Sequence, residues 1–149
     1  MSFKPSLEWI AGFFDGEGCV CTVRPSSSGP RHKSRLLIVS ITQADRTPLD
    51  DLREMFGGYV GCQKPKAGQN QAVFSWKVSA QKAENFLRAV QPYCRVKHQQ
   101  IEAALKLRQL VHAKDNPNRF DEIVQLSFEI SQLNGAHHTK PSIASLEVR

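Results

Sequence analysis

The segment from Trp9 to Gly18, Trp-Ile-Ala-Gly-Phe-Phe-Asp-Gly-Glu-Gly, constrains the fold more than any other part of the chain. Its residues recur at helical spacing, and Gly12 and Gly16 share one face of the expected helix. A glycine inside a helix costs about 1 kcal/mol relative to alanine, and close approach of a second helix offsets that cost. The chain holds no second segment of this kind. We therefore expect this helix to meet the same helix of another copy across a two-fold axis, through Ala11, Gly12, Asp15 and Gly16.

An acidic corner follows this helix. Glu17 would meet its own symmetry mate across the axis, and two close carboxylates repel unless a cation bridges them or they share a proton. Glutamate oxygens and backbone carbonyls suit a hard divalent cation such as Mg²⁺. A surface turn that merely contains acids is the alternative interpretation.

The rest of the chain predicts an α-β-β-α-β-β-α order followed by two more helices. Thr47 is expected to cap the second helix, with Pro48 at its first position and Gly57 at its end. These elements predict an α+β fold with a four-stranded antiparallel sheet, covered by helices on one face and open on the other. The expected helices span about 6–15, 47–57, 79–90, 97–112 and 117–133, and the strands about 18–24, 35–43, 59–64 and 72–78.

The length and the net charge of the chain limit the number of domains and the kinds of binding partner that we expect. The chain of 149 residues is expected to form one domain, 1–149, with a core over about 7–134 and a polar tail at 135–149. With 20 Lys plus Arg against 14 Asp plus Glu, the net charge of +6 fits a polyanion partner as well as plain solubility. No apolar run approaches the roughly 20 residues that a membrane span needs. No targeting signal is evident, so we expect the protein to act where it is made.

The cysteines are expected to be reduced. Cys19, Cys21, Cys62 and Cys94 form no Cys-x-x-Cys pair, and a zinc site built from them would be unusual. Mostly packed, free thiols are the favoured interpretation, which indicates a reducing compartment.

The open face of the sheet is expected to be polar and basic. Side chains such as Ser40, Thr42, Ser75 and Lys77 are of the type that reads base edges in a DNA major groove. A merely solvated sheet face is an equally good interpretation of the composition alone.

Residues 10–18, Ile-Ala-Gly-Phe-Phe-Asp-Gly-Glu-Gly, resemble the signature of the LAGLIDADG homing endonucleases. The resemblance covers about 7–134 and is greatest to the single-motif, homodimeric members encoded by algal organellar group I introns. It implies the family's αββαββα fold with additional C-terminal helices, and a saddle-shaped homodimer whose sheets lie in the DNA major groove. It also implies Mg²⁺-dependent cleavage of both strands of a long pseudo-palindromic target, with short 3′ overhangs. Intron homing in a chloroplast or mitochondrion is the implied setting.

The resemblance assigns roles within the motif. Glu17 matches the metal-binding acid, and the carbonyl of Gly16 matches a backbone metal ligand. Asp15 matches the second acid of the motif, which is structural and is not a metal ligand.

The resemblance also implies catalytic residues outside the motif. Gln43 and Lys97 match the polar residues around the metals and the attacking water. A basic residue is expected shortly after Gln43, near Arg46 or Thr47, and Arg46 is preferred because it carries charge. Without the resemblance, Gln43 and Lys97 read as ordinary surface residues.

DNA contacts are expected from strands, loops and tail. On the second strand, Ile38, Ser40 and Thr42 alternate with residues that should pack on helices. The first strand leaves two alternatives for its DNA-facing side, either Thr22 and Arg24 or Cys19, Cys21 and Val23. The full expected set is Thr22, Arg24, Arg31, Lys33, Arg35, Ile38, Ser40, Thr42, Gln63, Lys64, Lys66, Ser75, Lys77, His137, His138, Thr139 and Lys140.

Two other functions remain possible from the sequence. A DNA- or RNA-binding module of the same fold would bind without cleaving, for example as a splicing cofactor or regulator, and a structural interaction protein is a more distant third. Glu17 beside Gly16 favours the nuclease, because a pure binder has no need for facing carboxylates. The sequence offers no phosphate-binding glycine loop.

Overall fold

The computed structural model describes residues 4–25 and 33–135, and its elements follow the expected order. The predicted tail residues His137, His138, Thr139 and Lys140, and the loop residue Arg31, lie outside the described residues. No helix within the described ranges combines the length and the apolar character that a bilayer crossing requires. The elements are α1 (Leu7–Glu17), β1 (Gly18–Val23), β2 (Leu36–Gln43), α2 (Thr47–Phe56), β3 (Tyr59–Gln63), β4 (Val73–Ser79), α3 (Ala80–Val90), the 3₁₀ turn η1 (Gln91–Tyr93), α4 (His98–His112) and α5 (Arg119–Gly135).

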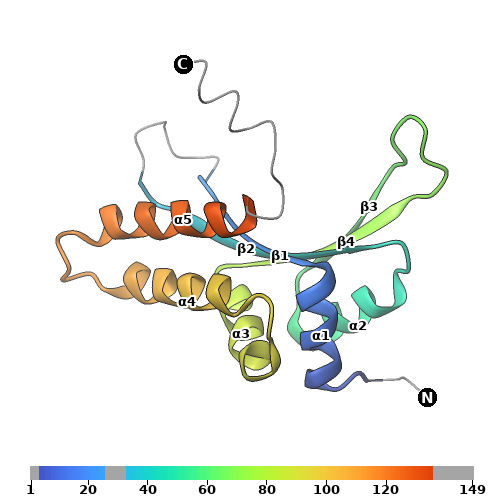
Figure 1. The fold of residues 1–149 in the computed structure, drawn as a ribbon, viewed down its shortest axis with the longest axis horizontal. Helices are drawn as coiled ribbons and strands as arrows, with labels where there is room; N and C mark the ends of the chain where they lie inside the picture. Colours follow the sequence, from blue (N-terminus) through green and yellow to red (C-terminus); the bar gives the residue numbers. More distant parts are fainter. Residues whose placement is uncertain (1–3, 26–32, 136–149) are drawn as a thin grey trace.

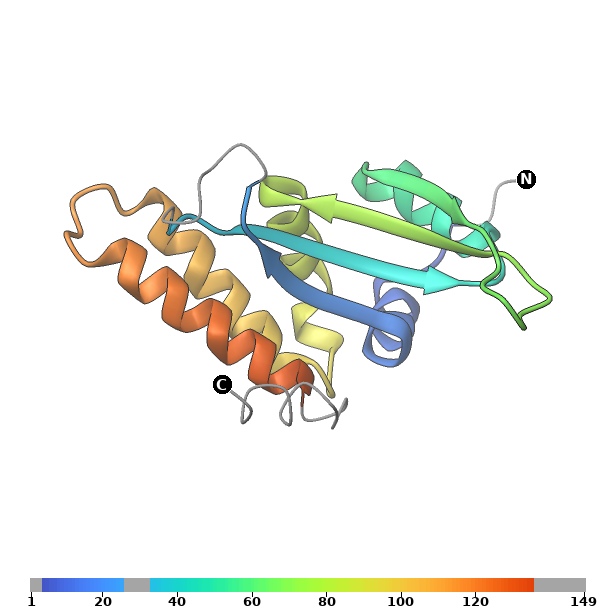
Figure 2. The ribbon, with the colours of Figure 1, turned by 90° about the horizontal axis from the view of Figure 1, so that it is seen from above.

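The four strands form one antiparallel sheet in the order β1-β2-β4-β3. Helices α1, α2 and α3 all lie on the same side of this sheet (Figure 1). Seen from above, the strands lie in front of α1, α2 and α3 (Figure 2). The predicted α+β architecture, with one covered and one open sheet face, is therefore confirmed.

The covered face is held by apolar side chains from the sheet and from all three helices. Phe86 of α3 sits at the centre, with its ring 5.1 Å from the Phe14 ring and 5.0 Å from the Trp76 ring in edge-to-face arrangements. The Trp76 indole also donates a hydrogen bond to the carbonyl of Gly57 at 2.9 Å. Burying these large rings is the main favourable contribution to this layer.

Helices α4 and α5 form an antiparallel hairpin beside the sheet (Figure 2). The second helix of the hairpin runs along β1, where the Asn134 amide donates to the carbonyl of Val20 at 2.7 Å. The edge strand β1 is thereby partly covered by protein.

The prediction that Thr47 caps α2 is wrong. Thr47 is the first residue of the helix, and Arg46 occupies the cap position without a side-chain cap bond. The Asp45 carboxylate accepts from the Thr47 amide at 2.9 Å and satisfies this donor from outside the helix. Pro48 consequently falls one position later than expected.

An ion pair joins α3 to α4. The Glu84 carboxylate accepts hydrogen bonds from Arg108 Nε at 3.0 Å and from Arg88 Nε at 3.1 Å, and Arg108 is only 8 % exposed. Burial raises the pKa of Glu84, but the bonds and charges of the two arginines outweigh burial and hold it below its ordinary value of 4.5.

We expect Glu84→Gln to lower the free energy of unfolding at pH 7 by about 2–3 kcal/mol, because buried Arg108 loses its counter-charge. A lowered folded-state pKa means that this stabilisation is present above the unfolded pKa and is lost as pH falls through the folded value. Urea unfolding of wild type and variant at pH 7 and at pH 3 measures the effect. The gap between the two proteins should shrink at pH 3, and an equal gap at both pH values would contradict the assignment.

Candidate active site and nucleic-acid interface

The junction of α1 and β1 places Glu17 at a sharp change of direction. Gly18 ends the helix, donates its amide to the carbonyl of Phe14, and is also the first residue of β1. A Cβ at this position would collide with the Phe14 ring. The lack of a side chain at Gly18 thus lets the sheet begin directly after Glu17, whose carboxylate is exposed.

Asp15 connects this junction to the start of α4. Its carboxylate accepts from the amides of Arg95 at 2.7 Å and Lys97 at 3.1 Å. Burial raises the pKa of Asp15, but the backbone hydrogen bonds from the segment before α4 outweigh burial and lower the pKa overall. Asp15 therefore acts as a structural acid.

Lys97 is held at the end of α1. Its ammonium donates to the backbone carbonyl of Asp15 at 3.0 Å and lies 6.0 Å from the centre of the Phe14 ring. A hollow of about 540 Å³ opens beside it. This junction hollow is lined by Asp15, Gly16, Glu17, Gly18, Cys19, Val96, Lys97, Gln100 and Asn134. The structure thus brings Lys97 next to the adjacent residues Gly16 and Glu17, from which it is distant in the sequence.

Gln43 and Arg46 are not among the residues that line this hollow. The side-chain oxygen Oε1 of Gln43 accepts from the backbone amide of Ala44 at 2.8 Å. The Arg46 guanidinium pairs with Asp50 at 3.1 Å and lies 5.6 Å from the centre of the Phe74 ring. Within one chain, these two predicted catalytic side chains are engaged elsewhere.

The donors present fit a hydrated Mg²⁺ better than a closed metal cage. Glu17 and the Gly16 carbonyl offer hard oxygen ligands, and Mg²⁺ commonly keeps several waters and takes one or two carboxylates. Within residues 4–25 and 33–135, no group of three His, Cys, Asp or Glu side chains is placed to hold an ion. A single chain thus supplies part of a site.

The strand register defines the open face of the sheet. Cys19 pairs with Ser40, Ser40 with Lys77, and Lys77 with Tyr59, so these four side chains form one row. The same alternation places on this face Cys21, Val23, Ile38, Thr42, Ser75 and Gln63, as predicted for the last four. Ser75 is nevertheless only 6 % exposed, so the expectation that its side chain is exposed on this face is wrong. Lys77 is exposed, and a Thr42–Ser75 hydroxyl contact of 3.2 Å ties neighbouring strands together.

The register also decides between the two alternatives for the first strand. Thr22 pairs with buried Leu37, which places it on the helix side of the sheet together with Val20. The placement of Thr22 on the open face is therefore wrong, whereas Arg24 lies beyond the end of β1 and its place among the DNA contacts stays a prediction. The strand begins at Gly18, directly at the end of α1, and this fixes its alternation.

Other predicted contacts lie in loops. Lys64 and Lys66 are exposed in the β3–β4 connection. Lys33 forms an ion pair of 2.6 Å with Asp121 of α5, and the Arg35 guanidinium donates to the carbonyl of Ser34 at 3.0 Å. Tyr59, 69 % exposed on the open face, was not predicted, although its place in the strand alternation could have identified it.

Cys19 and Cys21 are neighbours on this open face. All four cysteines are free, but the expectation that most are packed is wrong, because Cys19 and Cys62 are exposed and Cys21 and Cys94 are only half-buried. A hydrogen bond from Cys21 lowers the pKa of the Cys19 thiol despite its partial burial, and the charge of Lys97 acts in the same direction.

Part of the outer face of α1 has no packing partner among the described residues. Trp9, Gly12, Phe13 and Gly16 follow one another at helical spacing. Trp9 is 47 % exposed, a Cβ at either glycine would meet nothing within 4 Å, and Phe13 is half-buried and packs with one side against the core. Trp9 and Phe13 were not predicted here, although their spacing relative to the glycines is visible in the sequence.

Two of the predicted interface residues lie elsewhere on α1. Ala11 is 0 % exposed and belongs to the core, because it faces α3 and η1 on the inner side of the helix, so its placement in an interface is wrong. Asp15 is committed to the start of α4.

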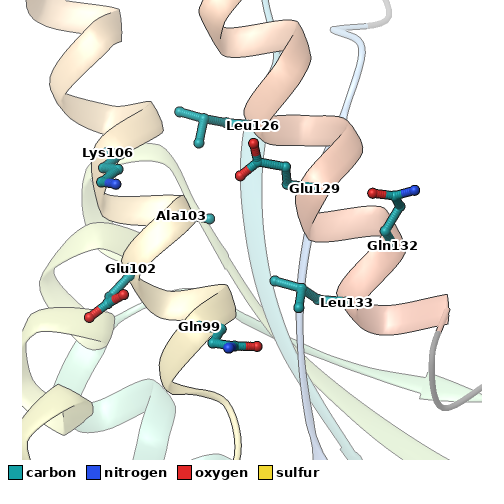
Figure 3. A pocket seen from close by; sticks show the side chains of 8 residues that line it. All are labelled: Gln99, Glu102, Ala103, Lys106, Leu126, Glu129, Gln132 and Leu133. Atoms are coloured by element: carbon teal, nitrogen blue, oxygen red, sulfur yellow. The ribbon is translucent and has the colours of Figure 1, made fainter.

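A second hollow lies between α4 and α5 (Figure 3). Ala103, Leu126 and Leu133 line it with apolar surface, and Glu102, Lys106 and Glu129 add charges of both signs. It shares no lining residue with the junction hollow and contains no predicted site residue.

We expect Asp15→Asn to keep the shape of the side chain and to weaken its bonds to the Arg95 and Lys97 amides. The charge-assisted bonds contribute about 1.5–3 kcal/mol, so the free energy of unfolding should fall by a comparable amount at pH 7. Urea unfolding measures the loss. Asp51→Asn, in α2 and without these bonds, is the matched control and should change stability by less than about 0.5 kcal/mol. Equal effects of the two substitutions would contradict the structural role of Asp15.

The sequence of this chain is similar to those of known endonucleases. No protein-family model matches the chain. It is 29% identical over 141 residues to the DNA endonuclease I-CreI of Chlamydomonas reinhardtii, covering 92% of this chain and 83% of that protein. It is 32% identical over 81 residues to the probable intron-encoded endonuclease 4 of Neurospora crassa, a match that spans 52% of this chain and 15% of that longer protein.

Solved structures show the same fold. The homing endonuclease I-CvuI, in complex with its target in the presence of 2 mM Ca, superposes with a TM-score of 0.67 at 21% identity, over 85% of this chain and 80% of that one. The archaeal intron-encoded homing endonuclease I-Vdi141I, complexed with DNA, gives 0.66 at 24% identity over 85% and 82%. The I-SmaMI LAGLIDADG homing endonuclease gives 0.63 at 22% identity, over 83% of this chain and 43% of that one. The motif at residues 10–18, the sequence similarity to I-CreI and the shared fold together show that the chain resembles the LAGLIDADG homing endonucleases.

Proposed function

We propose that the protein is a site-specific double-strand DNA endonuclease that acts as a homodimer. It cleaves a long pseudo-palindromic target by divalent-metal-dependent phosphodiester hydrolysis and leaves 3′ overhangs, in the service of intron homing. The observation that carries the proposal is the junction hollow, where Glu17, Gly16 and Lys97 meet beside an open sheet face. The relatives named as DNA endonucleases, and the fold shared with DNA complexes, support it.

Each residue of the hollow has a proposed role. The Glu17 carboxylate and the Gly16 carbonyl hold Mg²⁺, which supplies activation of water and neutralises charge on the phosphate. Lys97, fixed by Asp15, stabilises negative charge that develops on the phosphate. Gln43 and Arg46 remain proposed contributors that approach the site when DNA and a second subunit are bound.

A second copy completes the proposed enzyme. The outer face of α1 offers Trp9 and Phe13 as apolar contact area and Gly12 and Gly16 for close backbone approach. A two-fold axis along this face brings the two Glu17 corners together. The similarity also occupies under half of the I-SmaMI chain, which leaves room in that protein for a second unit of this size.

We expect Glu17→Gln to abolish cleavage and to retain DNA binding, because the substitution removes the metal-binding charge from a site where like charges face each other. A randomised pool of duplexes, selected for binding to this variant, yields the target. Wild type with Mg²⁺ should then linearise a plasmid that carries the target.

The matched control is Glu54→Gln, an exposed glutamate of α2, which should cleave like wild type. Cleavage by pure Glu17→Gln protein would contradict the proposed role of Glu17 as a metal ligand. A wild type that binds the selected duplex and never cuts it would support the binding-module alternative.

We expect Gly12→Leu to separate the two subunits without unfolding either. A Cβ at Gly12 meets nothing within 4 Å in the single chain, so the leucine fits the monomer and obstructs only an opposing helix. Sedimentation velocity should show a monomer with native circular dichroism and weakened DNA binding. Glu54→Leu adds the same side chain to α2 and should leave the dimer intact. A dimeric Gly12→Leu protein would sink the proposed interface.

We expect Lys77→Ala to relax base preference at two symmetry-related positions of the target. Lys77 projects from the centre of the open face, and a lysine that donates to guanine contributes about 1–3 kcal/mol of discrimination. Cleavage of a target library, base by base, measures the change. Lys64→Ala, in the β3–β4 loop, should weaken binding to all sequences alike. A uniform loss of cleavage with Lys77→Ala would make Lys77 a backbone contact.

A further inference from the structure

The first turn of α4 faces the junction hollow with unused hydrogen-bond donors. Val96, Lys97 and Gln100 line the hollow, and the first amide that finds an acceptor at this end is that of Ile101, 3.0 Å from the carbonyl of Lys97. The amides of His98, Gln99 and Gln100 meet no acceptor within the described part of the chain. The N-terminal end of a helix carries a partial positive charge, so this end attracts anions.

A buried carboxamide without a partner lies at the same place. Gln100 is 6 % exposed, lines the hollow, and forms no side-chain hydrogen bond to any described residue. Among the described residues, only the Ser127 hydroxyl is both completely shielded from solvent and without a hydrogen-bond partner. The side-chain amide of Gln100 has no partner among these residues either, but it is not completely shielded. The amide of Gln100 therefore reaches the surface at the hollow that it lines. Nearly buried polar groups are almost always hydrogen-bonded to protein or to water, so an amide with no protein partner at the wall of a hollow is available to donate to a ligand there.

The surrounding charges favour an anion that arrives together with a cation. The Asp15 carboxylate is consumed by two amides, and the Lys97 ammonium uses one of its donors on the Asp15 carbonyl. Glu17 alone opposes an anion, and a divalent cation on its carboxylate would reverse that effect. Donors from an amide side chain, a lysine and a helix N-terminus together suit the oxygens of a phosphate group.

We infer that the side-chain amide of Gln100, supported by the N-terminus of α4, binds a phosphate of the DNA backbone in the junction hollow. Gln100 is then a substrate-binding residue in addition to Glu17 and Lys97. This inference rests on the proposed function, because DNA is the polyanion that the open face adjoining the hollow would hold.

The test compares Gln100→Leu with Gln99→Leu. The neighbouring Gln99 side chain lies outside the junction hollow and should be replaceable without loss of binding or cleavage. Because Gln100 has no partner in the free protein, Gln100→Leu should raise the melting temperature, by about 2–4 °C. If Gln100 had a structural role, the substitution would lower the melting temperature instead.

Binding is measured with Ca²⁺ in place of Mg²⁺, on the selected duplex and on copies in which single phosphates are replaced by neutral methylphosphonates. Wild type should lose about tenfold in affinity at one phosphate per half-site, the size expected for one charge-assisted hydrogen bond. On the unmodified duplex, Gln100→Leu should bind about tenfold more weakly than wild type. Replacing the same phosphate by methylphosphonate should not weaken the binding of this variant further. Inorganic phosphate in place of DNA should fail to protect the wild type against heat at millimolar concentration. Protection by it would mean a free-anion site, contrary to the inference.

Each outcome decides between the two proposals. Equal methylphosphonate profiles for wild type and Gln100→Leu, or a lowered melting temperature of the variant, overturn the phosphate contact and leave the endonuclease proposal standing. A shifted profile on a duplex that wild type binds but never cuts with Mg²⁺ supports the contact and overturns the endonuclease. A wild type that binds no duplex overturns both.

Discussion

The carboxylate of Asp15 joins two parts of the chain that are 80 residues apart. By accepting the amides of Arg95 and Lys97, it fixes the start of α4 against the end of α1. The Lys97 ammonium returns a bond to the Asp15 carbonyl, so both the backbone and the side chain of Lys97 are held by one residue. The hollow that Glu17, Lys97 and Gln100 share exists because of this connection.

Helix α1 has separate inner and outer faces. Ile10, Ala11 and Phe14 are fully buried on the inner side and hold the helix on the sheet. The outer side presents Gly12 and Gly16 with open space around them. The acidic end of the same helix therefore lies next to the core, at the edge of the hollow and on the proposed two-fold axis. Substitutions in this helix are expected to affect stability, the site and dimer formation together.

The open sheet face and the acidic site are formed by different side chains, but the two surfaces adjoin each other. Lys77, Ser40 and Cys19 form one row across the strands, and Cys19 also lines the junction hollow. The proposed sequence reading by the sheet and the proposed chemistry at the hollow would therefore rely on different side chains of one continuous surface. This separation is why substitutions of Lys77 and of Glu17 are expected to have different effects.

The sequence by itself determined the order of the elements, the faces of β2 and β4, and the acid at the end of α1, because helical and strand periodicities are local properties of the chain. It also indicated Glu17 and Lys97, through the resemblance of residues 7–134 to a known family. Local pattern could not settle the face of β1, since a one-residue change of register inverts every side chain and pairing with β2 decides it.

The tertiary structure alone decided which residues share the hollow. It moved Ala11 from the interface to the core, engaged Gln43 and Arg46 with local partners, and brought Gln100 beside Glu17. The physical reason is that a hollow is made by elements distant in the chain, here α1, β1, α4 and α5. No spacing within any one of them records how the others pack.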